Sequence, residues 1–139
     1  MNKNNSEIIK NFKRKHMILI RGIPGSGKST IAEMLSIAGY RHLEADMWFY
    51  NTYGWYNWSK EDSPKAHAWC QEEANLLASK GFNIVITNTF IKKSQMEPYI
   101  NIAKQYKYKV TVLVATNNFE SIHNVPKETL ETMRREFEY

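Results

Sequence analysis

Apolar runs of strand length alternate with apolar patterns of helical spacing along most of this chain. The strand-like runs occupy residues 17–21, 41–45, 83–87 and 109–115, and the helical patterns occupy residues 28–38 and 63–80 and begin again at Ser94 and near Pro126. Such alternation is typical of parallel strands joined by helices that cross over the sheet. It predicts an α/β fold of three layers, in which a short parallel sheet of four to five strands has helices on both faces and right-handed crossovers.

Glycines and capping residues predict where these elements begin and end. Gly39 and Gly81 follow the first two helical patterns, and Ser63-Pro64 predicts a cap residue followed by proline at the first helical position. Ser94 is expected to cap the third helix, and the polar and aromatic residues 46–62 are interpreted as a loop. Met96, Tyr99, Ile100 and Ala103 of the third helix are expected to face the core. The last helix is expected to run through Leu130, Met133 and Phe137, and the last strand to have Val110, Val112 and Val114 on one face and Leu113 on the other.

Composition predicts one soluble domain. At 139 residues, with 42% hydrophobic and 13% aromatic content, residues 17–139 can form a single core. No apolar stretch is long enough to span a membrane, and Cys70 has no cysteine partner, so we expect a cytoplasmic protein without disulfides. Residues 1–16 hold five of the 19 basic but one of the 14 acidic residues. This basic extension could bind a phosphate backbone, but we favour a solvated tail or a short amphipathic helix.

Residues 22–30 read Gly-Ile-Pro-Gly-Ser-Gly-Lys-Ser-Thr, the complete G-x-x-x-x-G-K-[ST] pattern of a phosphate-binding loop between a strand and a helix. Its glycines let backbone N–H groups approach the α- and β-phosphates, Lys28 can reach the β- and γ-phosphates, and the Ser29 hydroxyl can coordinate Mg²⁺. The loop predicts ATP and Mg²⁺ as cofactors. The residues expected to bind the nucleotide are Gly22, Pro24, Gly25, Ser26, Gly27, Lys28, Ser29 and Thr30.

A phosphate-binding loop in a chain this short favours a small kinase of the P-loop NTPase/kinase fold. The chain has no room for the helical subdomain of a motor ATPase and lacks the Asn-Lys-x-Asp pattern that reads guanine. A kinase needs a carboxylate to accept the proton of the acceptor hydroxyl. Asp46 directly follows the strand 41–45, at the edge where ligands of parallel sheets bind, so we predict Asp46 as the base and as a metal-side carboxylate. The alternative is that Asp46 only caps a turn. Glu44 alternates with it and is predicted to support the substrate side.

Four other polar side chains are candidates for the site. Asn88 follows the strand 83–87, where many phosphate-loop proteins carry an acidic residue, and is predicted to contact a metal-bound water or the substrate, unless it satisfies backbone groups. His67 lies one turn into the second helix and could contact the acceptor, although a single helical histidine more often has a packing or hydrogen-bonding role. Arg134 and Arg135 on the last helix are predicted to contact the nucleotide, unless they are only solvated.

Residues 47–58 contain seven aromatic side chains, more than a surface loop requires. Exposed rings can stack on bases, so a single-stranded end or a nucleoside could be held beside Asp46. About half of the seven rings are expected to pack under the second helix against Trp69, and Tyr50, Tyr53 and Trp55 are predicted to be the exposed ones.

Taken together, these motifs resemble the polynucleotide-kinase-like branch of the P-loop kinases, which includes the phage 5′-hydroxyl polynucleotide kinase. The matching pieces are residues 22–30, 44–46, 66–70, 87–90, 97–99 and 123–126, with Met133, and they cover nearly all of residues 17–138. The resemblance implies ATP-dependent phosphorylation of a hydroxyl, often on a nucleic acid, and implies that Asp46 is the general base.

Two positions depart from that family. Three residues after the base, where the phage enzyme has an arginine that binds the acceptor phosphate, this chain has Phe49. The predicted lid, residues 117–123, has no arginine to stabilise charge on the transferring phosphoryl group. The leading prediction is a kinase of a nucleic-acid or nucleoside hydroxyl. A kinase of a modified base or small metabolite, and a nucleotide-gated binding module without turnover, stay open as alternatives.

Overall fold

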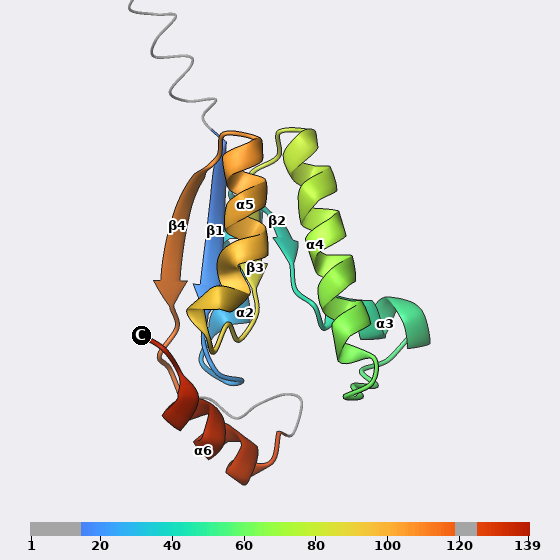
Figure 1. Ribbon diagram of the computed structural model, residues 1–139, viewed down its shortest axis with the longest axis vertical. Coiled ribbons are helices and arrows are strands. Elements are labelled where there is room, and N and C mark those ends of the chain that lie inside the picture. Colours follow the sequence, from blue (N-terminus) through green and yellow to red (C-terminus); the bar gives the residue numbers. More distant parts are fainter. Residues whose placement is uncertain (1–14, 119–124) are drawn as a thin grey trace, which may run out of the picture.

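Four parallel strands form the centre of the fold. The computed structural model describes residues 15–118 and 125–139. Strands β1 (His16–Arg21), β2 (Arg41–Leu43), β3 (Ile84–Thr87) and β4 (Lys109–Val114) are arranged in the order β2-β3-β1-β4, and every neighbouring pair is parallel. The carboxyl ends of all four strands therefore lie at one edge of the sheet, the lower edge in Figure 1.

Helices cover both faces of this sheet. Helices α4 (Ser63–Ser79) and α5 (Glu97–Gln105) lie in front of it, and α2 (Lys28–Ile37) lies behind it (Figure 1). A 3-10 helix, η1 (Lys93–Met96), leads into α5, while α3 (Met47–Tyr53) and α6 (Lys127–Glu136) lie beyond the carboxyl ends of the strands. This arrangement confirms the predicted three-layer α/β fold with a four-stranded parallel sheet.

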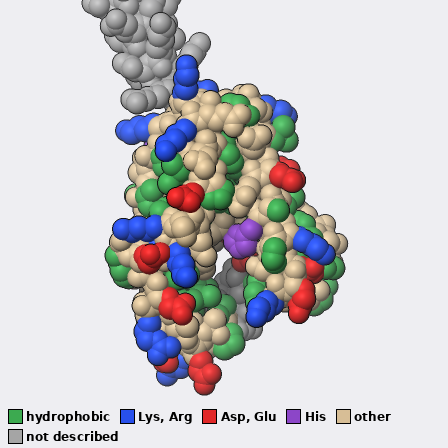
Figure 2. Space-filling model, in the orientation of Figure 1, with side chains coloured by type: hydrophobic (Ala, Val, Ile, Leu, Met, Phe, Trp, Pro, Cys, Tyr) green, Lys and Arg blue, Asp and Glu red, His purple; other side chains and the backbone are tan. Residues whose placement is uncertain are grey.

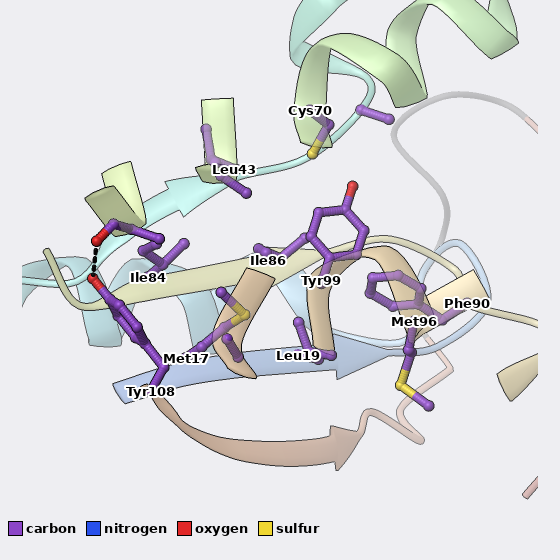
Figure 3. Close-up of a cluster of buried hydrophobic side chains, with 14 of the residues drawn as sticks. Met17, Leu19, Leu43, Cys70, Ile84, Ile86, Phe90, Met96, Tyr99 and Tyr108 are labelled. Carbon is purple, nitrogen blue, oxygen red and sulfur yellow. Dashed lines mark hydrogen bonds between the residues drawn. The ribbon is translucent and has the colours of Figure 1, made fainter. Parts of the chain in front are cut away.

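Alternation along the central strands divides the core between the two faces. Met17 and Leu19 of β1 face α4 and α5 in the larger cluster of buried side chains, together with Ile86 of the next strand (Figure 3). Ile18 and Ile20 point to the other face and pack with α2 in a smaller cluster. Both faces of the interior strands are buried, which is the usual pattern of a parallel sheet covered on both sides.

The β4 strand is less covered than the interior strands β1 and β3. Val112 and Val114 lie on one face and Leu113 on the other, as expected, but all three side chains remain exposed. This difference arises because β4 is an edge strand of the sheet, with a neighbour on one side only.

Helix α3 was not expected from the sequence, which reads as a loop over residues 46–62. The helix forms because Phe49 is 1% exposed and packs into the larger core cluster, while Gly54 ends it at a φ of 79° and donates from its N–H to the carbonyl of Tyr50. The short aromatic helix is thus stabilised by tertiary burial and a glycine C-cap.

Several predicted boundaries are also corrected. The strand predicted over residues 41–45 stops at Leu43, because the next residues turn toward the site. Ser63 is the first residue of α4 and not its cap, and Ser94 lies inside η1 and does not cap α5. His16 belongs to β1 and not to the basic extension, most of which lies outside the described residues. Among the helices of residues 15–118 and 125–139, none is long and apolar enough to cross a membrane.

Candidate active site

The phosphate-binding loop joins β1 to α2 at the carboxyl edge of the sheet. Its backbone is fixed at both ends, because the N–H of Gly22 donates to the carbonyl of Thr89 at 3.2 Å and the N–H of Asn117 donates to the carbonyl of Ser26 at 3.1 Å. Gly25 and Gly27 have φ values of 81° and 96°, a region that side chains disfavour. A Cβ atom at Gly22 would come within 2.9 Å of the Ala115 carbonyl oxygen, so only glycine fits this turn.

The loop leaves donors open for an anion. Helix α2 begins after Gly27 without a side-chain cap and with no acidic residue in its first turn, so its first N–H groups have no side-chain partner. Ser26 is buried, and its Oγ atom has no hydrogen-bond partner in the described part of the chain. Ser29 and Thr30 are exposed at the start of the helix. These groups fit the phosphates of a nucleotide.

Lys28 is held in place before any ligand binds. Its Nζ donates to the carbonyl oxygens of Gly22 at 2.7 Å and Ile23 at 3.0 Å. Burial lowers the pKa of Lys28 to about 8, and the carboxylates of Glu44 and Asp46 act against that shift. The ammonium group is therefore positioned at the loop with two carboxylates nearby.

Glu44 and Asp46 leave the end of β2 in a tight turn that starts α3. The N–H of Met47 donates to the Glu44 carbonyl, and the N–H of Phe49 donates to the Asp46 carbonyl, both at 3.1 Å. The turn is tied to β3, because the N–H of Ala45 donates to Asn88 Oδ1 at 2.9 Å. The Asn88 side chain, 9% exposed, therefore satisfies a backbone group, which was the alternative to its predicted contact with a substrate or metal-bound water.

A hydrogen-bond chain that the sequence did not reveal joins β2 and β3. The Thr87 hydroxyl donates to Glu44 Oε2 at 2.9 Å, so its oxygen accepts from His42 Nε2 at 2.6 Å. Burial lowers the pKa of His42, against the effect of Glu44. His42 lies on β2 and Glu44 directly follows this strand, but only the pairing of β2 with β3 brings Thr87 to them.

The donors at this edge suit Mg²⁺ bound together with a nucleotide. No group of three or more His, Cys, Asp and Glu side chains within residues 15–118 and 125–139 could hold a metal ion by itself. Mg²⁺ often keeps several waters and uses only one or two protein ligands plus phosphates. The hydroxyl of Ser29 and the carboxylates of Glu44 and Asp46 are oxygen donors of the required kind, beside the phosphate-binding loop.

The aromatic side chains of residues 47–58 divide as expected between core and surface. Phe49 is buried, and Trp48 and Tyr56 pack partly against the core. Tyr50, Tyr53 and Trp55 are exposed as predicted, and Trp58 is exposed as well. Tyr53 also donates to Asp62 Oδ2 at 2.8 Å. Several rings therefore remain available on the surface of α3 and the following loop.

Tyr56 is a site residue that sequence reasoning did not select. Its ring lies 5.9 Å from that of Phe49 and 5.8 Å from that of Tyr50. Burial raises the pKa of Tyr56, and the Asp46 carboxylate adds to this effect. The charge of Asp46 thus affects the ionisation of the Tyr56 hydroxyl. The sequence does not distinguish Tyr56 from the other aromatic residues of this segment.

Helix α6 forms the other wall of the site. Arg134 lines a cavity of about 280 Å³ that Gly22, Ser26 and Asn117 also line, and it donates to Asn118 Oδ1 at 3.2 Å. Arg135 is exposed and donates to Thr132. The two arginines therefore differ, since Arg134 alone of the pair lines the cavity at the phosphate-binding loop.

Figure 2 shows a hollow between α6 and the side of α3 and α4, below the strand ends. His67 is exposed on α4, so it remains accessible to a ligand, but no hydrogen bond of its ring ties it to the site among the described residues. Most of the predicted lid, residues 119–123, lies outside the described residues.

Comparisons with known proteins agree with this geometry. The profile of the family AAA_33, AAA domain, matches residues 17–139. NEDD4-binding protein 2 from Homo sapiens is 30% identical over an alignment of 134 residues that covers 88% of this chain and 8% of that protein, so the chain spans a small part of this relative.

Two solved structures are similar in fold. A chain of the Pnkp1/Rnl/Hen1 RNA repair complex superposes with a TM-score of 0.63 at 17% identity, over 86% of this chain and 36% of that one. The Mycobacterium tuberculosis APS kinase CysC, in complex with AMPPNP and APS, has a TM-score of 0.55 at 15% identity, over 86% of this chain and 68% of that one. With a phosphate-binding loop at the carboxyl edge of a β2-β3-β1-β4 sheet and a family match over residues 17–139, the chain belongs to the AAA domain family AAA_33 and has a three-layer α/β P-loop fold.

Proposed function

We propose that the protein transfers the γ-phosphoryl group of ATP to a hydroxyl group of a nucleic acid or nucleoside, with Asp46 as the general base. The observation that carries this proposal is that Asp46 follows β2 at the carboxyl edge of the sheet, where the phosphate-binding loop also lies, and directly precedes the aromatic helix α3. Its carboxylate acts on the pKa of Lys28 in the phosphate-binding loop and on the pKa of Tyr56 in the aromatic segment. A base between the phosphate donor and a surface for the acceptor is what phosphoryl transfer to a hydroxyl requires.

Each residue would have a separate role in the reaction. The Asp46 carboxylate takes the proton of the acceptor hydroxyl as the acceptor oxygen bonds to the γ-phosphorus and the bond to the ADP leaving oxygen breaks. Lys28, already held by two carbonyl oxygens, stabilises charge on the phosphates. Ser29 and Asp46 would hold Mg²⁺, which would supply positive charge against the phosphates when bound. Arg134 lines the cavity beside the loop and would contact the nucleotide.

The acceptor is inferred from the aromatic surface. Tyr50, Tyr53, Trp55 and Trp58 present exposed rings on the α3 side of the site. Base stacking on such rings does not depend strongly on sequence and contributes about 1–3 kcal/mol per base. Similarity in fold to a chain of an RNA repair complex is consistent with a nucleic-acid acceptor. We therefore favour an acceptor that carries a base, such as a 5′-hydroxyl end.

A smaller acceptor is the second candidate. Phe49 occupies the position where the family resemblance would place an acceptor-binding arginine, and it is buried in the core. A buried ring cannot bind the phosphate next to an acceptor hydroxyl. This favours a modified base or a small metabolite, without a phosphate at that point, over a long polynucleotide.

Phosphoryl transfer from γ-labelled ATP tests both candidates. The wild-type protein and the Asp46→Asn variant are incubated with Mg²⁺ and, in parallel, 5′-hydroxyl RNA, 5′-hydroxyl DNA, nucleosides and small hydroxyl metabolites. The Glu61→Gln variant, which removes an exposed carboxylate from the loop before α4, is the control. We expect label to enter a base-containing acceptor with the wild type and the control but not with Asp46→Asn.

Nucleotide binding must be followed in the same variants. Asp46→Asn should still bind a fluorescent ATP analogue, because the loop and Lys28 are unchanged. Nucleotide binding without transfer to any acceptor would contradict the kinase proposal and favour a nucleotide-gated binding module.

A further inference from the structure

The end of β3 carries no carboxylate next to the phosphate-binding loop. It reads Thr87-Asn88-Thr89, so all three side chains that follow Ile86 are neutral. A metal ion that is bound mainly through phosphates and waters depends on nearby acceptors to orient those waters. The negative charge must therefore come from another element.

Asn88 cannot supply this function without a structural cost. Its Oδ1 accepts from the Ala45 N–H at 2.9 Å, and its Nδ2 lies 3.5 Å from the Tyr99 hydroxyl. Turning the amide toward a metal would leave a buried backbone N–H unpaired, which costs about 1–3 kcal/mol. Asn88 is a positioning residue for the Glu44–Asp46 turn.

Glu44 reaches the same place from β2. Thr87 is 1% exposed, and its hydroxyl donates to Glu44 Oε2, while His42 Nε2 lies 3.8 Å from that oxygen. In the part of the chain that the structure describes, the other carboxylate oxygen, Oε1, accepts no hydrogen bond. The Glu44 side chain is 23% exposed, so it is partly accessible at the edge of the site.

Glu44 is also the carboxylate that acts most strongly on Lys28, ahead of Asp46. The Lys28 ammonium donates to carbonyl oxygens of the phosphate-binding loop, so the charge of Glu44 acts at that loop as well as at the end of β3. The Thr87 hydroxyl thus fixes Glu44 Oε2 at the end of β3, and the Glu44 carboxylate is near enough to the phosphate-binding loop to act on Lys28.

We propose that Glu44, held by the Thr87 hydroxyl, supplies from β2 the negative charge that orients the water shell of nucleotide-bound Mg²⁺, which no side chain at the end of β3 supplies. The inference rests on the proposed function for the presence of Mg-nucleotide. It goes beyond that function, which gives Glu44 no role in orienting the water shell of the metal ion. His42 and Thr87 become positioning residues for this carboxylate.

The test measures how Mg²⁺ changes nucleotide binding, without turnover. A fluorescent ATP analogue is titrated onto the protein in EDTA and at increasing Mg²⁺. We expect Glu44→Gln to bind the free analogue at least as well as the wild type but to need about 10–100 times more Mg²⁺ for half of the metal-dependent change. Glu33→Gln, which removes an exposed carboxylate from α2, should behave as the wild type.

A variant with a carboxylate on β3 in place of Glu44 tests whether the position of this negative charge, and not Glu44 itself, determines the Mg²⁺ response. In the Glu44→Gln/Thr87→Asp variant the carboxylate stands on the strand that lacks one, and we expect most of the Mg²⁺ response to return. Glu44→Asp keeps the charge on β2 and should show a partial response, which keeps the proposal testable if an aspartate at the buried position 87 prevents folding. Thr87→Val should raise the Mg²⁺ requirement without removing the charge.

Two outcomes would overturn the proposal. One is a Glu44→Gln variant with the Mg²⁺ response of the wild type. The other is loss of analogue binding in EDTA as well, which would assign Glu44 to the placement of Lys28. A protein whose Mg²⁺ response depends on Glu44 but which transfers no phosphoryl group would support this inference while it contradicts the proposed kinase function.

Discussion

Arg21 and Phe137, at opposite ends of the domain sequence, are stacked with the guanidinium carbon 4.5 Å from the ring centre. The Arg21 side chain is 2% exposed, and it donates to the carbonyl oxygens of Phe90 at 2.8 Å and of Glu138. The N–H of Glu138 donates in turn to the Ile91 carbonyl at 2.9 Å. The residue that precedes the phosphate-binding loop therefore fixes the end of α6, the helix that carries Arg134 to the site.

The Arg21→Gln variant should be clearly destabilised. Losing a guanidinium bound to several buried carbonyl groups is expected to lower the free energy of unfolding by about 2–4 kcal/mol, since hydrogen bonds to charged groups contribute more than neutral ones. Chemical denaturation measures the loss. Arg41→Gln is a matched control, because Arg41 stacks on Phe82 at the same 4.5 Å but at an exposed position, and its loss should cost less than about 1 kcal/mol. Equal losses in both variants would contradict the role of the carbonyl contacts.

Nucleotide affinity should fall as the pH rises through about 8. Burial lowers the pKa of Lys28 to about 8, so the ammonium that attracts phosphate is present below that pH and is lost above it. Between pH 7 and pH 9.5 we expect the Kd of an ATP analogue to rise about tenfold. Fluorescence titrations over this range measure the effect. Because arginine stays charged, a Lys28→Arg variant that still binds should have a flatter profile; two identical profiles would show that another group is responsible.

Arg134 and Arg135 should respond differently to substitution by alanine. Arg134 lines the cavity at the phosphate-binding loop, whereas the adjacent Arg135 contacts only Thr132 among the described residues. Arg134→Ala should reduce kcat/KM for ATP about 10–100-fold, the equivalent of one charge-assisted contact. Steady-state kinetics with Arg135→Ala as the neighbouring control decide between a nucleotide contact and a general effect of charge on α6.

The exposed tryptophans should contribute to acceptor binding. Trp55→Ala and Trp58→Ala are each expected to weaken binding of a short single-stranded oligonucleotide by about 1–3 kcal/mol, the usual contribution of one stacked base. Fluorescence anisotropy measures this, and both variants should keep their thermal stability because these rings are exposed. Leu76→Ala, an exposed apolar change in the last turn of α4, is the control. Unchanged affinity in both tryptophan variants would remove the support for a stacked acceptor.

Asn88→Ala should affect stability and activity together. The change leaves the buried Ala45 N–H without its acceptor, which is expected to cost about 1–3 kcal/mol of stability. It also frees the turn that places Asp46, so kcat should fall more than the affinity for ATP. Asn75→Ala, at an exposed position on α4, is the stability control. A fall in ATP affinity alone would indicate a direct contact of Asn88 with the nucleotide.

The sequence was informative wherever function depends on consecutive residues. The loop from Gly22 to Thr30 sets its own conformation, because its glycines permit the positive φ values that the turn requires. The buried runs of β1 and β3 likewise predict interior parallel strands from local pattern alone. Asp46 could be located by its place after a strand, since the carboxyl ends of parallel strands always meet at one edge.

The amino-acid sequence by itself determined the order of strands and helices, the phosphate-binding loop and the edge of the sheet at which the site lies. Only the tertiary structure decided which side chains meet there: Thr87 with Glu44, Asn88 with Ala45, and Arg21 with the end of α6. It also formed α3, through the burial of Phe49. The physical reason is that local pattern reports propensity and periodicity over a few residues, whereas these contacts join residues 43 to 117 positions apart and depend on the strand order.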